Sequence, residues 1–254
     1  SHGVNYTKAH VWEQAWHRSA GSSWYTQPTI YKRTGPGNAQ DGGLKFDLNQ
    51  INDSYFNRLR SRAIIYGQNN IYVVVNIYDR FSVHNGNTMS DQWLGHPFNS
   101  ANNINNINGD PLNQGHGLDT ETLIMPAITT YQEAYVQHLV DTLTDLDNVI
   151  WEVAMEPWGG YTRNGFGPTG FVDHFINYIK SYESTKLKQH PVLQGVFYPS
   201  TTGDNNYIFS SGADVVSPNG GGGFDHDCPA LSGAKVVLED TDHISWTETD
   251  GADW

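Results

Sequence analysis

Six apolar runs are spaced along the chain, and each of them predicts a β-strand. They cover residues 4–12, 71–78, 148–155, 191–198, 213–218 and 234–240. The run at residues 71–78 is an almost unbroken series of β-branched and aromatic residues. Such a run is typical of a strand that is buried on both faces, so we expect a parallel sheet.

Three stretches between these runs carry apolar residues at helical spacing. In the first, Asp47 is the predicted N-cap, Gln50 lies three residues later, and the apolar positions extend to Ala63. The second opens with a capping box at residues 130–133, and the third covers residues 171–182. The predicted elements therefore alternate between strand and helix.

Two long segments, residues 13–46 and 79–125, are rich in Gly, Asn and Ser and are predicted to be irregular loops. Connections that leave strands are long, whereas those from helix back to strand are mostly short. Long loops on one face of a (β/α) barrel form its active site. We therefore predict an α/β fold, a TIM barrel of the (β/α)8 type, in one domain spanning residues 1–254. An open doubly wound sheet is the alternative, but residues 12–16 lack the Gly-rich phosphate loop that usually follows its first strand.

Composition narrows the choice of ligand. The formal net charge of -13 disfavours nucleic acid and anionic membranes as partners. Aromatic residues form 13% of the chain and include 8 Trp, which suits flat uncharged ligands such as sugars, with ordinary core packing as the alternative.

The single cysteine, Cys228, excludes an internal disulfide, and no apolar run reaches transmembrane length. No signal peptide is visible, and because Ser1 is not an initiator Met we expect a trimmed N-terminus or a start within the gene.

Carboxylates stand at the ends of two predicted strands. Glu156 follows the run at residues 148–155, and Glu239 and Asp240 end the last run. Cleavage of a glycosidic bond requires one carboxyl group that protonates the leaving oxygen and a second that attacks the anomeric carbon or activates water. Strand ends that are distant in sequence converge in a barrel. Adjacent strand residues point to opposite sides, so only one of Glu239 and Asp240 can face the axis.

Residues 148–157, Asn-Val-Ile-Trp-Glu-Val-Ala-Met-Glu-Pro, resemble the fourth-strand motif of the clan of retaining TIM-barrel glycoside hydrolases, which is similar to glycoside hydrolase family 5 and includes many cellulases and mannanases. That motif ends in Asn-Glu-Pro, and the resemblance implies that Glu156 is the acid/base. The nucleophile of the clan ends the seventh strand, where the resemblance implies Asp240, with Glu239 as a rival. Residues 33–37, 96–99, 145–149 and 235–243 also resemble a cellulase-like branch of such barrels.

Two features depart from the clan. Met155 stands where the clan has an Asn that donates a hydrogen bond to the sugar, and a thioether cannot donate. We expect weaker stabilisation of the transition state, or compensation by another residue. The two acids also fall on the third and sixth predicted strands, so the barrel should lack the first and last strands of the pattern. Its open edges invite pairing with another chain, and we expect a homodimer or a rearranged loop to close them.

Further aromatic and polar residues are candidates for substrate binding at the same mouth, with core packing or a solvated strand end as the alternative. They are Lys8, His10, Trp12, Trp93, His96, Trp158, Tyr198, His243 and Trp246. His243 could instead orient Asp240. The spacing of residues 225–228 matches no standard metal site, and we expect neither a metal nor another cofactor.

The sequence thus predicts a retaining glycoside hydrolase of β-linked glycans, and specifically an endo-β-1,4-glucanase. Its expected partner is a polysaccharide or oligosaccharide, with no nucleic acid and no membrane, and its expected localisation is secreted. Two alternatives stay open. One is an exo-acting β-glycosidase on small galactosides, mannosides or glucosides, and the other is a degenerate barrel that binds carbohydrate without cleaving it.

Overall fold

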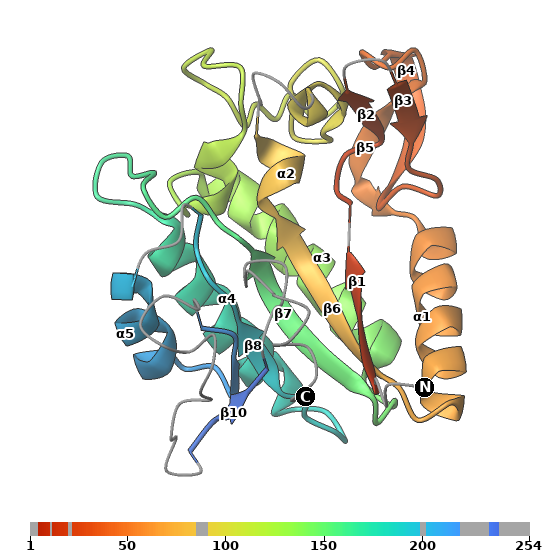
Figure 1. Cartoon of the computed structure of the whole chain (residues 1–254). Helices are drawn as coiled ribbons and strands as arrows, with labels where there is room; N and C mark the ends of the chain where they lie inside the picture. The colour runs from red at the N-terminus through yellow and green to blue at the C-terminus, as the bar shows by residue number, and fades with distance from the viewer. Residues whose placement is uncertain are drawn as a thin grey trace.

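A computed structural model of the chain describes residues 5–10, 12–19, 22–84, 91–198, 202–218 and 234–238. Six parallel strands form the main sheet in the order β1-β6-β7-β8-β9-β10 (Figure 1). Their bounds are β1 Tyr6–His10, β6 Tyr72–Asp79, β7 Val149–Met155, β8 Val192–Gln194, β9 Val215–Val216 and β10 Val236–Val237. The six predicted strands and their parallel pairing are confirmed, although the last three are shorter than their apolar runs.

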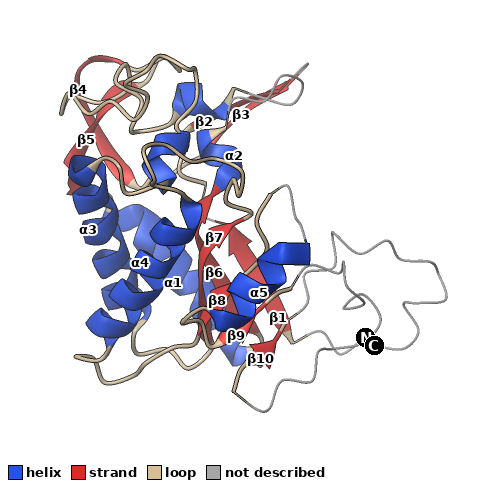
Figure 2. Cartoon of the chain, turned by 90° about the vertical axis from the view of Figure 1, so that its left-hand side faces the viewer, coloured by secondary structure: helices blue, strands red, loops and turns tan. Residues whose placement is uncertain are grey.

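Helices follow the strands and cover one face of the sheet. Figure 2 shows α1 (Asp53–Gln68), α3 (Pro126–Leu143) and α4 (Pro168–Glu183) on this face, where Trp151 is fully buried in the main hydrophobic core. A further helix, α5 (Thr202–Ser210), lies in a segment for which the sequence predicted no element. Among the described residues, β1 and β10 are the two edges of the sheet, which is the form of an incomplete TIM barrel. None of the described helices is long and apolar enough to cross a bilayer.

The opposite face of the sheet is the one that points inward in a barrel. It carries a small apolar cluster of Val74, Leu193 and Val215. It also carries an ion pair between Lys8 and Glu152, whose Nζ and Oε1 atoms lie 3.2 Å apart. The carboxylate of Glu152 is almost completely buried, so the neighbouring ammonium offsets part of the cost of its desolvation.

Two predicted helix starts are wrong. Asp47 and Gln50 lie in a strand, where the Gln50 amide donates to the Asp47 carboxylate at 2.7 Å. The first helix instead begins after Asn52, whose side chain accepts from the Ser54 N–H. The helix α3 begins at Pro126, which suits the first turn because its missing N–H needs no partner there. Thr130 lies inside α3 and donates its hydroxyl to the Pro126 carbonyl at 3.0 Å.

The segment of residues 13–46 is not an irregular loop, as predicted, but contains two β-hairpins. One is β2 (Trp16–Ser19) with β3 (Ser22–Tyr25), and the other is β4 (Tyr31–Asn38) with β5 (Leu44–Ile51). Both lie at the end of the molecule toward which β6 points (Figure 1). The second long connection contains the short helix α2 (Arg80–Val83) and the 3₁₀ turns η1 (Gln92–Gly95) and η2 (Leu118–Glu121).

Candidate active site

The strand β7 delivers Glu156 to the carboxyl end of the sheet. The strand ends at Met155, and Pro157 cannot continue its hydrogen-bond ladder. Glu156 has a φ of +47°, in the left-handed region that a residue with a Cβ seldom adopts. Its side chain lies buried, with 8% of the residue exposed. Strained backbone of this kind often accompanies a functional side chain.

Arg80 holds the Glu156 carboxylate. Its Nη2 atom donates to Glu156 Oε2 at 2.6 Å, and both side chains are buried. Arg80 is the first residue of α2 and directly follows the end of β6, so neighbouring strands supply the two charges. The guanidinium carbon also lies 3.8 Å from the centre of the Tyr198 ring and 5.6 Å from that of Trp158. Cation–π attraction in a desolvated site adds to the ion pair.

Aromatic rings pack against one side of this ion pair. Trp158 packs against Tyr198 with ring centres 5.3 Å apart, and it stacks on His84 at 5.0 Å. Backbone hydrogen bonds from Tyr198 N to Pro157 O and from Gly159 N to Tyr198 O join the segments that follow β7 and β8. Tyr198 keeps 40% of its surface exposed. The rings thus offer a partly open aromatic surface next to a buried acid.

Three further acids are buried at the same end of the sheet. Burial raises the pKa of Glu13 to about 8. Burial also raises the pKa of Asp79 to about 7, and the charges of Glu13 and Glu156 add to this effect while Arg80 opposes it. Burial raises the pKa of Glu121 well above its usual range, and within the described residues neither of its carboxylate oxygens has a hydrogen-bond partner. Acids with raised pKa values concentrate at functional sites because burial there is tolerated for chemistry.

Asp79 and Arg80 were missed by the sequence reasoning. Asp79 ends β6, where the backbone pairs it with Met155 of β7, and its side chain accepts from the Phe81 N–H at 2.8 Å. The signal was available, because a carboxylate after an apolar run is the same pattern that singled out Glu156. No sequence pattern singles out Arg80, because its contact with Glu156 depends on the burial of α2.

The structure brings together some of the predicted binding residues. Trp158 and Tyr198 lie beside Glu156 as described, and His10 lies near the site, with its Nδ1 atom 3.9 Å from Asp79 Oδ2. Lys8 is engaged with Glu152 on the inward face of the sheet. Trp12 is half-buried and lies against His17, with ring centres 5.6 Å apart.

Trp93 and His96 lie in the interior and not at the mouth where they were predicted. The two rings stack at 5.0 Å and are 3% and 1% exposed. Burial lowers the pKa of His96 to about 3, so its ring is neutral beside Glu13. Gly109 and Gly117 explain the location of Trp93, because a Cβ at either would fall within 2.7 Å and 2.2 Å of the indole ring. The surrounding loop is therefore built around this ring as a core.

The remaining predicted residues lie outside the described part of the chain. They are the proposed nucleophiles Glu239 and Asp240 and the binding candidates His243 and Trp246. The segment of residues 225–228 lies outside it as well. Within the described ranges, no group of three or more His, Cys, Asp or Glu side chains is placed to hold a metal ion.

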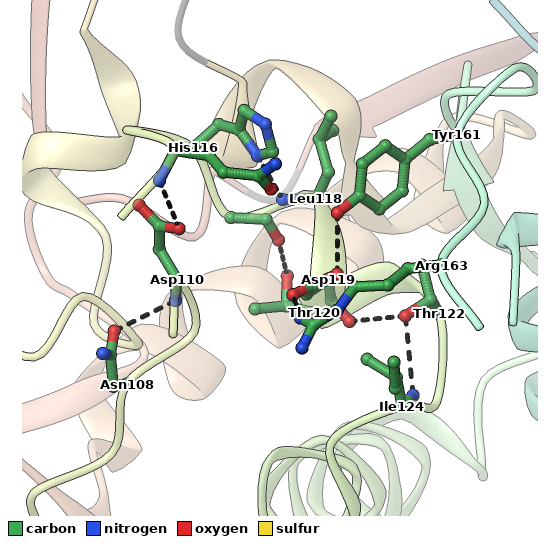
Figure 3. Close-up of polar contacts among 12 residues, drawn as sticks. Asn108, Asp110, His116, Leu118, Asp119, Thr120, Thr122, Ile124, Tyr161 and Arg163 are labelled. Atoms are coloured by element: carbon green, nitrogen blue, oxygen red, sulfur yellow. Dashed lines mark hydrogen bonds and ion pairs between the residues drawn. The ribbon is translucent and has the colours of Figure 1, made fainter. Parts of the chain in front are cut away.

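A polar cluster fixes the loop after Trp158 to the body of the molecule. Figure 3 shows Tyr161 and Arg163 converging on Asp119 of η2. The Tyr161 hydroxyl donates to the Asp119 carboxylate at 2.7 Å, and Arg163 donates to its other oxygen. Asp119 is 4% exposed, so its charge depends on these two partners. The segment that borders Glu156 is thereby held in place from both sides.

Together these features define a half-barrel of parallel strands with a buried acid at the carboxyl end of its third strand. The chain belongs to the family described as Domain of unknown function (DUF6298), which matches residues 7–196. The matched part includes β1, β6, β7, β8 and Glu156, and it ends before β9 and β10. Comparison with curated protein sequences gives no significant match.

Solved structures with a similar fold are glycoside hydrolases. A family 5 mannosidase from Rhizomucor miehei aligns with a TM-score of 0.50 at 10% identity, covering 85% of this chain and 48% of that protein. A family 5 enzyme from Prevotella bryantii gives 0.47 at 9%, covering 86% and 65%. Endo-glycoceramidase II from Rhodococcus sp. gives 0.42 at 13%, covering 68% and 41%. This chain spans about half the length of the mannosidase, with which it shares the fold of a TIM-barrel glycosidase.

Proposed function

We propose that the protein is a retaining glycoside hydrolase of β-linked glycans, acting as an endo-β-1,4-glucanase with Glu156 as its acid/base. One observation carries the proposal. Glu156 is presented in a left-handed conformation at the carboxyl end of β7, buried against Arg80 and beside the rings of Trp158 and Tyr198. Cleavage of a glycan requires two carboxyl groups, of which Glu156 is one, and an aromatic surface beside the acid suits the stacking of sugar rings.

In the proposed reaction Glu156 donates its proton to the leaving glycosidic oxygen. A second carboxylate attacks the anomeric carbon and forms a covalent glycosyl-enzyme, and the bond to the leaving group breaks. Glu156, now ionised, removes a proton from water, and the resulting hydroxide releases the sugar with its original configuration. Asp240 is the proposed nucleophile and Glu239 its rival. A separation of about 5–5.5 Å between the two carboxyl groups would be required for this retaining route.

Arg80 has a specific part in this scheme. In the resting site it donates to Glu156 Oε2, and in this scheme the proton that Glu156 transfers to the leaving oxygen is carried on Oε1. When Glu156 becomes ionised after the first step, the same guanidinium stabilises the carboxylate.

The test compares two Glu→Gln variants on soluble β-1,4-glucan, β-mannan, xyloglucan and aryl β-glycosides. Glu156→Gln should lower the release of reducing ends by about 10²–10⁴-fold. The loss should be smaller on aryl glycosides, whose leaving groups need little protonation. Glu133→Gln is the matched control, because Glu133 is a half-buried acid on α3 paired with His174 at 2.9 Å. Hydrolysis by Glu156→Gln at the wild-type rate would contradict the assignment.

A second candidate function is carbohydrate binding without cleavage. It is favoured by the ion pair that engages Glu156 and by Met155, which lies half-buried at the end of β7 where the clan has an amide donor. A wild-type protein that binds glucan but releases no reducing ends from any of the substrates would support this function.

A further inference from the structure

The two hairpins line an open pocket that the proposed catalytic site does not use. Its volume is about 240 Å³, and its wall includes Tyr25, Thr26, Thr29, Arg33, Asp41 and Asn52. By the same measure one water molecule needs only about 10–15 Å³, so the space accommodates a larger guest. The hairpin pocket, as we name it, is lined by polar and apolar groups in nearly equal measure, from β3, β4 and the turns beside them.

A fixed ion pair forms part of the wall. Both terminal nitrogens of the Arg33 guanidinium donate hydrogen bonds to the Asp41 carboxylate, at 3.0 Å and 2.5 Å. The Asp41 side chain is 4% exposed and also accepts from the Gly43 N–H at 3.1 Å, while Arg33 remains 21% exposed and lies over the Phe46 ring. Such a two-point contact fixes the orientation of the guanidinium. Because the two charges offset each other, the wall suits a neutral guest with hydroxyl groups.

Gly43 is required for the close approach of this pair. A Cβ at this position would lie 1.9 Å from Arg33 Nη1 and 3.1 Å from its guanidinium carbon. The terminus of an arginine can normally move aside at little cost, but here Asp41 and Phe46 hold it. The absence of a side chain at Gly43 therefore makes room for the ion pair.

An aromatic ring completes the pocket. Tyr25 is 56% exposed and ends β3, next to Trp24, which is 47% exposed. A ring that is more than half exposed, placed beside fixed donors and acceptors, offers contact to both the apolar face and the hydroxyl edge of a pyranose. The two hairpins lie at the end of the molecule toward which β6 points (Figure 1), and Glu156 follows β7 at the same end of the sheet because β7 runs parallel to β6.

We propose that the hairpin pocket binds one pyranose unit of a neutral glycan, as a subsite distinct from the cleavage site. Tyr25 stacks on the sugar ring, and the exposed edge of Arg33 donates to its hydroxyls. The choice of glycan rests on the proposed function, but the binding itself does not require that the protein hydrolyse its ligand. A long chain held at this subsite is retained near Glu156 between successive encounters.

The test uses the 254-residue chain carrying Glu156→Gln, titrated with cellohexaose and with mannohexaose by calorimetry. Tyr25→Ala and Gly43→Ala should each weaken binding of the tighter of the two ligands by roughly tenfold. Tyr72→Ala is the matched control, because Tyr72 is 48% exposed but begins β6 at the opposite end of the sheet. Circular dichroism of Gly43→Ala checks that the hairpin folds, and Arg33→Lys provides a second change at the ion pair.

Unchanged affinity in both Tyr25→Ala and Gly43→Ala would overturn the proposal, as would a parent protein that binds neither hexasaccharide. Binding of sodium sulfate that depends on Arg33, without binding of either saccharide, would also overturn it in favour of an anion site. The two proposals fail separately. Loss of saccharide binding in Tyr25→Ala, in a protein whose wild type cleaves nothing, would retain the pocket and reject the hydrolase.

Discussion

Each end of the parallel sheet carries an ion pair between an arginine and a carboxylate, but one pair is buried and the other is exposed to solvent. At the carboxyl end Arg80 contacts Glu156 at 2.6 Å, with the two side chains 6% and 10% exposed. Near the amino end of β7 Arg60 contacts Asp145, also at 2.6 Å, with exposures of 33% and 58%. Distance alone does not distinguish the pairs. The buried pair carries a desolvation cost that the exposed pair avoids.

The pKa values of the acids also differ between the two ends of the sheet. At the carboxyl end, burial raises the pKa values of Glu13, Asp79 and Glu121. At the amino end, the hydrogen bond from Arg60 lowers the pKa of Asp145. At the amino end the acid is stabilised by its partner in contact with water, whereas at the carboxyl end acids are buried at a cost in desolvation. In TIM barrels the carboxyl end is the one that carries catalysis.

The strongest test of this comparison removes the cation from each pair. Arg80→Met leaves the buried carboxylate of Glu156 without its partner and should lower the free energy of unfolding by about 3–5 kcal/mol. Arg60→Met, the matched control, should change it by less than about 1 kcal/mol. Urea denaturation followed by circular dichroism measures both. Equal losses in the two variants would show that the ends do not differ as described.

A second test uses pH. Below about pH 4.5 Glu13 is protonated in both states, and between there and about 8 the folded protein retains a proton that the unfolded chain has released. Asp79 behaves in the same way up to about pH 7. The folded state binds more protons, so stability must fall as pH rises through this window. We expect the melting temperature to drop by on the order of 5–10 °C between pH 5.5 and 9.

Glu13→Gln is the control for the pH dependence. The amide keeps the shape of the side chain and its acceptor oxygen but removes its titration. The drop between pH 5.5 and 9 should become smaller, and the part that remains should belong mainly to Asp79. A melting profile of Glu13→Gln parallel to that of the wild type would exclude Glu13 as its source.

The smallest expected effect concerns the loop that borders Glu156. Asp119→Asn removes the charge that Arg163 contacts but keeps an acceptor for the Tyr161 hydroxyl. We expect a loss of about 1–3 kcal/mol and faster amide exchange between residues 159 and 166, measured by hydrogen exchange with mass spectrometry. Exchange in α1 should not change. Uniform acceleration throughout the chain would indicate general destabilisation and not release of this loop.

The sheet could be predicted from sequence because parallel strands that are buried on both faces leave unbroken apolar runs. Residues 71–78 are the clearest example, and the strand β6 occupies nearly the same positions. The hairpins left no such signal. The strand β4 contains Gly35, Pro36 and Gly37, and its exposed positions alternate irregularly, so its local composition resembles that of a loop. Its pairing with β5 depends on contacts that composition does not reveal.

The candidate site was predictable only in part, for a related reason. Glu156 stands out because an acid and a proline follow an apolar strand. The interior location of Trp93 could not be read from its neighbours, since a Gly-rich loop can turn an aromatic ring toward solvent or toward the core. Whether Arg80 pairs with Glu156 depends on how α2 packs after β6, which is a tertiary property.

The left-handed backbone at Glu156 sets folding against chemistry at a single position. A non-glycine residue in this conformation costs roughly 1–2 kcal/mol, and its burial adds the cost of desolvating a carboxylate. Replacing Glu156 with Gly would relieve both, but it would leave the buried guanidinium of Arg80 without its partner, so a gain in stability requires that Arg80 be replaced as well. Any lineage of this family that lost its need for Glu156 would therefore be expected to change the two residues together. The residues at these two positions would then record whether selection for activity has continued.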